Sequence, residues 1–317
     1  MHRMSSGAPV IGGLAARPLH VAPITSIVTP AMASEPDFSP DFGQTDPGLA
    51  VLRMAALIAQ SVDDPDEETL DLLFEQVEAG HLVDAQPAQM WTELVRGLMS
   101  PAPSKMIKTL RGCGALVEIL PEVAALFGVP QISDGQDEVD LGQHLMRSLD
   151  AAAKRGATLP VRFALLAMNV GKSDSPREHL PVHYKHVERG RPRIEEMSAR
   201  FLAPADCRDL ALLALAECER VHRVSKMRAG PVALMLERIG AFEAPERFRE
   251  LMMVCAIDFC AHEGREGQTY PKSALLEIAL KACAEVTENG SAEARQTARA
   301  EAIALAFRSE RWSSEVP

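Results

Sequence analysis

Histidine and carboxylate side chains with the chemistry of metal ligands recur from residue 140 onward. Asp140 and His144 are four residues apart, a spacing that places both on one face of a helix. Imidazole and carboxylate groups bind divalent metals, but isolated histidines more often lie at the surface or form hydrogen bonds in the core. A metal site and a purely structural role therefore both stay open at this point.

Basic side chains gather in one stretch that has the chemistry to contact phosphate groups. Residues 185–193 contain Lys185, Arg189, Arg191 and Arg193, and further arginines follow up to residue 228. Lysine and arginine neutralise the phosphates of a nucleic acid, whereas the same residues on an exposed helix form a solvated charged rim. The stretch is a candidate nucleic-acid contact, with the solvated rim as the alternative.

The composition is that of a helical globular protein. The chain has 317 residues, of which 47% are apolar, 24% are charged and only 4% are aromatic. Leu, Ala, Met, Glu and Arg dominate, and all of them favour helices. The formal net charge of −11 argues against a general polyanion-binding protein, which carries a basic face. It leaves room for a local basic patch.

Three further features concern the cellular compartment. The six cysteines form no CxxC pair, which predicts reduced, buried thiols in a cytoplasmic protein. No apolar run reaches the ~20 residues that a membrane helix needs, so no membrane contact is expected. Residues 1–45 are rich in Gly, Ala, Pro, Ser and Thr and have few charges, which predicts a disordered leader. A transit segment and a mis-assigned start are the alternatives for this leader.

Helices are the elements that must position these side chains. Apolar residues at a spacing of three to four, and end signals such as Asp46 before Pro47, predict them throughout. The predicted helices span residues 46–60, 66–79, 87–99, 103–112, 138–154, 161–169, 190–202, 205–223, 230–240, 245–263, 272–287 and 291–309. Residues 131–137 are predicted to form a polar loop, and Pro181 to Val187 comes closest to a strand pattern. The predicted fold class is all-α.

Three segments resemble one protein family in their order and spacing. They are LPEVAALFGVPQ (Leu120 to Gln131), EVDLGQH (Glu138 to His144) and VRFALLAMNVGKS (Val161 to Ser173). They resemble bacterial CCA-adding tRNA nucleotidyltransferases of the type that carries an HD phosphohydrolase domain after the neck and body. The resemblance covers residues 46–290. It implies a helical neck and body over residues 46–130, a degenerate HD-like helical domain over 131–290, and a C-terminal helix and tail over 291–317.

The family pattern also shows what differs at the N-terminal side. The family's catalytic head precedes the neck and holds two Mg²⁺ through a D-x-D pair. Only 45 residues precede the neck here, without a D-x-D pair, so the head is expected to be missing. Leu52-Arg53 of the neck pattern persists, whereas Ala56-Leu57 replace its Arg-Phe. Arg53 is retained as a candidate nucleic-acid contact, as is Lys172 of the family's Gly-Lys pair.

The HD metal site is degenerate in the same comparison. The pattern has an early His, an adjacent His-Asp pair on a helix and a late Asp. Gln136, Met168-Asn169 and Asp258 stand at these positions, so only Asp258 keeps a ligand, and Cys218 replaces a further histidine. No cofactor is expected, unless a divalent metal binds a rebuilt site. The residues available for such a site are His144, His183, His186, His222 and Asp258.

The resemblance implies a function in tRNA processing. The favoured interpretation is a truncated, catalytically inactive relative of the CCA-adding and poly(A) polymerase family that acts as an RNA- or protein-binding scaffold. Its expected partner is tRNA or another structured RNA. One alternative is an HD-type, metal-dependent phosphohydrolase with rearranged ligands. The other is the tRNA-holding half of a split nucleotidyltransferase, whose catalytic head is a separate protein.

Overall fold

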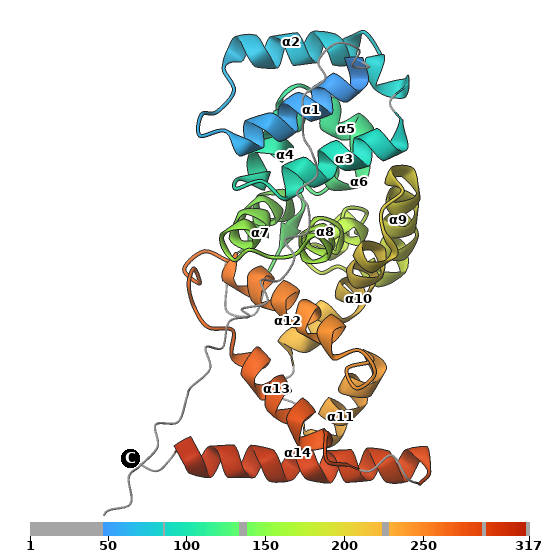
Figure 1. Ribbon diagram of the computed structural model, residues 1–317, viewed down its shortest axis with the longest axis vertical. Coiled ribbons are helices and arrows are strands. Elements are labelled where there is room, and N and C mark those ends of the chain that lie inside the picture. Colours follow the sequence, from blue (N-terminus) through green and yellow to red (C-terminus); the bar gives the residue numbers. More distant parts are fainter. Residues whose placement is uncertain (1–46, 85, 133–137, 224–227, 287–289, 315–317) are drawn as a thin grey trace, which may run out of the picture. The chain divides into compact units, whose positions relative to one another are not determined.

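A computed structural model (Figure 1) describes residues 47–84, 86–132, 138–223, 228–286 and 290–314. The leader predicted for residues 1–45 and the early histidine position at Gln136 lie outside these ranges. The described residues form helices, turns and one pair of two-residue strands. The predicted all-α class is confirmed. None of the described helices is both long enough and apolar enough to cross a membrane.

The first helices gather around α1, whose residues Val51, Leu52 and Ala55 are fully buried. Their bounds are α1 (Pro47–Gln60), α2 (Glu67–Glu78), α3 (Pro87–Leu98), α4 (Pro103–Gly112), α5 (Ala115–Ile119) and α6 (Pro121–Ala124). α1 packs against both α3 and α4 (Figure 1). The apolar residues at a spacing of three to four that predicted this helix therefore form its buried face.

A short antiparallel ribbon stands where the sequence predicted a loop and the start of a helix. β1 (Pro130–Gln131) pairs with β2 (Val139–Asp140). α7 (Leu141–Lys154) begins three residues later than the predicted start at 138, because Asp140 is its N-cap. The Asp140 carboxylate accepts a hydrogen bond of 2.8 Å from the Gln143 N–H. Asp140 thus caps α7.

The remaining helices are organised around α10. Their bounds are α8 (Leu159–Ala167), α9 (His186–Phe201), α10 (Ala205–His222), α11 (Ala229–Arg238), α12 (Pro245–Cys260), α13 (Pro271–Cys283) and α14 (Ala292–Ser314). α10 contacts α8, α9 and α12, and α14 contacts α11 and α13 (Figure 1). This packing brings the C-terminal part of α10 beside α12, where the candidate site lies.

The segment between α8 and α9 contains turns and no strand, although Pro181 to Val187 came closest to a strand pattern. α9 begins at His186, four residues before the predicted start, and continues through Pro192. It crosses the 3-10 turn Val170–Lys172 at very close range. A Cβ at Gly171 would lie 2.0 Å from the carbonyl oxygen of His186. The glycine of the family's Gly-Lys pair is therefore required here for backbone packing.

Candidate metal centre around Asp258

Asp258 of α12 is the residue on which the candidate site converges. Its carboxylate is buried, with the residue 8% exposed. One oxygen, Oδ1, accepts a hydrogen bond of 2.9 Å from Nε2 of His144 on α7. The other, Oδ2, lies 3.0 Å from Nε2 of His222 on α10. Three helices thus contribute one side chain each. The two histidines that contact Asp258, His144 and His222, are both among the predicted metal candidates.

Two further side chains surround His222. The Sγ atom of Cys218, one helical turn earlier on α10, lies 3.4 Å from the same Nε2 atom. The hydroxyl of Tyr270 lies 2.8 Å from the other ring nitrogen, Nδ1. Protein side chains therefore contact both ring nitrogens of His222.

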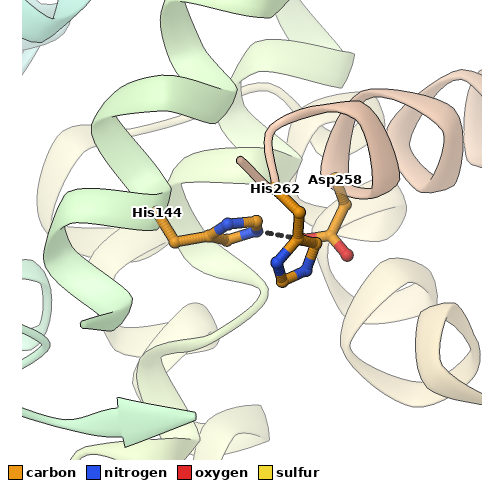
Figure 2. Close-up of side chains that lie close together, drawn as sticks. All are labelled: His144, Asp258 and His262. Carbon is orange, nitrogen blue, oxygen red and sulfur yellow. Dashed lines mark hydrogen bonds and ion pairs between the residues drawn. The ribbon is translucent and has the colours of Figure 1, made fainter. Parts of the chain in front are cut away.

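His262 completes the cluster and was not among the predicted candidates. It follows the end of α12, and its ring lies against that of His144 with 4.4 Å between the ring centroids (Figure 2). Burial lowers the pKa of His262 to about 4, so its ring is neutral at pH 7. A signal for it was present in the sequence, since Asp258 and His262 are four residues apart and so belong on one face of a helix.

The charges of this centre are strongly coupled. Burial acts to raise the pKa of Asp258, but hydrogen bonds from His144 and His222 hold it well below its usual range. Burial also acts to lower the pKa of His222, yet its contacts with Cys218 and Asp258 raise it to about 10. A hydrogen bond with Cys255, together with burial, raises the pKa of the Cys218 thiol well above its usual value. Cys218 is therefore a neutral thiol at pH 7, and the charge that keeps His222 protonated is that of Asp258.

The residues that the family resemblance places at the HD pattern's His-Asp pair are not ligands for a hard metal. These residues, Met168 and Asn169, are both buried at the end of α8. A thioether is a poor ligand for hard cations, and an amide supplies no charge. Among the described residues, the groups able to hold a metal comprise one carboxylate, one thiol and three imidazoles, and all of them involve Asp258. No step of hydrolysis is derived from this centre.

His183 belongs to a separate network. Its Nε2–H donates a hydrogen bond of 3.0 Å to the Pro130 carbonyl oxygen, and its Nδ1 accepts one of 2.7 Å from the Ser175 hydroxyl. Arg189 in turn donates to the Ser175 oxygen at 3.0 Å. This chain of donors matches a neutral imidazole, and burial lowers the pKa of His183 accordingly. Both nitrogens of His183 are thus occupied by protein partners.

His186 and Lys172 meet at Glu219, on the same helix as His222. The ammonium of Lys172 is 3.0 Å from a carboxylate oxygen of Glu219, and Nε2 of His186 is 3.7 Å from the same oxygen. Lys172 also donates to the side chain of Gln131 on β1. The five predicted metal candidates therefore divide: His144, His222 and Asp258 come together, whereas His183 and His186 lie in this second network, which we call the Glu219 network.

The candidate nucleic-acid contacts divide in a similar way. Lys172 is buried in the Glu219 network, and Arg189 and Arg193 donate to the carbonyl oxygens of Gly171 and Val170 at 3.1 and 2.8 Å. These side chains hold the turn that follows α8.

Arg53 donates at 2.8 Å to Glu93 of α3, which also binds Arg96. Lys185 is exposed, and the side chain of Arg191 is 56% exposed and 3.9 Å from Glu195. Lys185 and Arg191 are therefore the candidates of this set that face solvent.

Comparison with known proteins shows that the chain is similar to Multifunctional CCA proteins of bacteria. No family model matches it. The Multifunctional CCA protein of Burkholderia lata is 40% identical over 271 residues, which are 82% of this chain and 66% of that protein. Its counterpart in Burkholderia vietnamiensis is 41% identical over 239 residues (75% and 58%), and that of Cupriavidus necator is 41% identical over 227 residues (72% and 55%).

The chain thus spans between about half and two thirds of the length of these curated relatives. Identity of this level over most of the chain confirms the resemblance read from the three segments. The chain belongs to this family as a CCA-adding tRNA nucleotidyltransferase-like protein.

Proposed function

We propose that this chain acts in tRNA processing as an RNA-binding scaffold, and that its described helices do not catalyse nucleotidyl transfer. The family relationship supports tRNA, or another structured RNA, as the partner. The observation that carries the proposal is about 40% identity to Multifunctional CCA proteins, combined with Met168-Asn169 at the position where the resemblance places the family's His-Asp pair.

The ligand groups of the described residues support the second half of this proposal. Nucleotidyl transfer uses two metal ions that paired carboxylates hold at the attacking and leaving oxygens. The described groups able to hold a metal all involve the single carboxylate of Asp258. A centre with one carboxylate and several imidazoles does not provide that arrangement.

Two exposed basic positions support the RNA-binding half. Lys185 and Arg191 lie near the start of α9 and face solvent. A separate basic surface is an open pocket between α4 and α7. Lys108, Arg111 and Gln143 are among the residues that line it. Such groups neutralise phosphates on a chain whose overall charge is negative.

The test is tRNA binding by the full chain, measured by fluorescence anisotropy at several salt concentrations. Saturable binding is expected, and the slope of log affinity against log salt should correspond to several phosphate contacts, each of which contributes about 0.9 on duplex DNA. Reversing two charges, in Lys185→Glu/Arg191→Glu, is expected to lower this slope by about two such contacts. The matched control is Arg249→Glu/Lys281→Glu, which changes the charge equally at two exposed positions on α12 and α13. Absence of binding at low salt would overturn the proposal.

Incorporation of CTP or ATP into a tRNA that lacks its 3′ CCA sequence tests the proposed inactivity. We expect no incorporation by the pure chain at any Mg²⁺ concentration. Any incorporation by the pure chain would overturn the proposed inactivity, and the Asp258→Asn variant would then show whether the centre around Asp258 is needed for it.

One observation favours the HD-type phosphohydrolase as a second candidate. His144, His222 and Asp258 lie together although they come from three helices. The test is hydrolysis of an activated phosphodiester by the full chain with Mn²⁺, Ni²⁺ or Zn²⁺. Turnover that is lost in Asp258→Asn and kept in His183→Gln would favour the hydrolase over the scaffold.

A further inference from the structure

Three side-chain atoms, from Cys218 and His222 of α10 and from Asp258 of α12, lie close together. The Sγ of Cys218 is 3.4 Å from Nε2 of His222, that nitrogen is 3.0 Å from Oδ2 of Asp258, and all three residues offer ligand atoms within 4.8 Å of one another. In a tetrahedral zinc site with bonds of about 2.0–2.3 Å, neighbouring ligand atoms are about 3.3–3.8 Å apart. The observed spacing is close to that of atoms sharing one ion.

The other ring nitrogen of His222 and the other carboxylate oxygen of Asp258 each have a separate protein partner. Nδ1 of His222 contacts the Tyr270 hydroxyl at 2.8 Å, and Oδ1 of Asp258 accepts from His144 at 2.9 Å. Outer partners of this kind orient the ligands of metal sites, as a hydrogen bond to the non-coordinating nitrogen fixes the tautomer of a ligating histidine. They leave Nε2 of His222 beside both Sγ of Cys218 and Oδ2 of Asp258.

We propose that Cys218, His222 and Asp258 bind one zinc-type ion. The Nε2 atom of His222 has room for one proton or one metal bond, yet it faces a sulfur and an oxygen together. A proton there satisfies one neighbour at a time, whereas an ion bound to all three atoms satisfies each of them. Binding displaces the thiol proton of Cys218 and the proton on Nε2, because a metal is bound by the thiolate and the neutral imidazole.

The donor set selects the class of metal. A thiolate is a soft ligand that favours Zn²⁺ over Mg²⁺ or Mn²⁺, and imidazole suits Zn²⁺ as well. The family resemblance places Met168-Asn169 at the His-Asp pair of the hard-metal pattern and Cys218 at one of its histidines. A ligand set that contains this thiol favours zinc over a hard metal.

The partial exposure of one ligand gives an ion access to this site, and the burial of the other two allows the bound ion to stabilise the fold. Cys218 and Asp258 are buried, while the side chain of His222 is 26% exposed. The exposed edge of His222 gives the ion a path from solvent. Once bound, the ion ties α10 to α12, two helices that carry all three ligands.

The first experiment is a titration of the chelator-treated full chain with Co²⁺, followed by displacement with Zn²⁺. We expect one ion per chain, visible ligand-field bands and a sulfur-to-cobalt charge-transfer absorption in the near ultraviolet. Cys218→Ser is expected to abolish the sulfur absorption and to weaken Zn²⁺ binding at least 100-fold. The control Cys283→Ser, which changes another buried cysteine, is expected to retain both.

Outer partners give a second set of variants. His144→Gln and Tyr270→Phe remove a hydrogen bond to a ligand and are each expected to weaken Zn²⁺ binding about 10- to 100-fold while the sulfur absorption persists. The proposal is overturned if micromolar Co²⁺ does not bind, if bound Co²⁺ shows no sulfur absorption, or if Cys218→Ser binds as the unmodified chain does. Circular dichroism establishes that Cys218→Ser folds, and if it does not, the spectrum of the unmodified chain and the two outer variants decide the question.

Discussion

The centre around Asp258 and the Glu219 network both draw on α10, yet they use their histidines in different ways. In the Glu219 network, His183 donates to one protein oxygen and accepts from another, so both ring nitrogens are satisfied. Around Asp258, one nitrogen of His222 faces two partners. Both histidines have a partner on each ring nitrogen, but Nε2 of His222 lies beside a sulfur as well as an oxygen, and the proposed zinc ion rests on this difference.

Removing the carboxylate of Asp258 is expected to have the largest effect on this contrast. Asp258→Asn leaves the protonated His222 without its charge partner in a buried site, which destabilises the chelator-treated protein by about 3–5 kcal/mol. Urea unfolding measures this change in free energy. The control Asp209→Asn, at a 40% exposed position on α10, is expected to change stability by less than about 0.5 kcal/mol. Equal effects of the two variants would show that the buried centre contributes no more than a surface pair.

The Glu219 network depends instead on close backbone packing. Gly171→Ala places a methyl group against the His186 carbonyl oxygen and is expected to cost about 1–3 kcal/mol. Gly230→Ala is the matched control, because a Cβ there meets nothing within 4 Å, and it is expected to be neutral or to stabilise by up to about 1 kcal/mol. Thermal unfolding of both variants checks the prediction, and an unchanged melting temperature for Gly171→Ala would contradict it.

The protonation of His183 gives a smaller, pH-dependent effect. Burial lowers the pKa of His183 in the folded chain below the ordinary value of 6.5, so the unfolded chain binds a proton more readily. Stability is therefore full above pH 6.5 and is lost as the pH falls below that value. His183→Gln is expected to remove this part of the acid sensitivity, which urea unfolding at a series of pH values measures. A variant curve parallel to that of the unmodified chain would contradict the assignment of His183 as a neutral structural residue.

The smallest effect on stability is expected at the exposed basic positions. Arg191→Gln removes an ion pair with Glu195 that lies at the surface, and such pairs contribute about 0–1 kcal/mol. Arg193→Gln removes the hydrogen bonds to Val170 and Ser173 and is expected to cost more, about 1–3 kcal/mol. Parallel urea unfolding of the two variants compares them. Equal losses of unfolding free energy in the two variants would indicate that the hydrogen bonds of Arg193 stabilise the chain no more than the surface ion pair of Arg191 does.

Local sequence determined most of the helices and the family. Apolar spacing and capping residues predicted the all-α class, because helix formation depends on neighbours three and four residues away. The sequence did not predict the ribbon at 130–131 and 139–140, because a strand of two residues is too short to show an alternation of apolar and polar side chains. α9 began before its predicted start because packing against Gly171 supports its first turn.

The residues of the metal centre were visible only in part. Cys218 with His222, and Asp258 with His262, each show the spacing of four residues that places two side chains on one helix face. The early histidine position assigned to Gln136 lies outside the described residues, and a histidine that contacts Asp258 in the described structure is His144.

The sequence by itself determined the helical class, the family and the chemical types of the side chains available. Only the tertiary structure decided which of them meet. His144 and Asp258 are 114 residues apart, and helix packing alone brings them within a hydrogen bond. The same packing placed Lys172 and Arg193 on internal oxygens and left Lys185 and Arg191 in solvent. Local periodicity records which face of each helix is apolar, but it does not record which two faces are buried against each other.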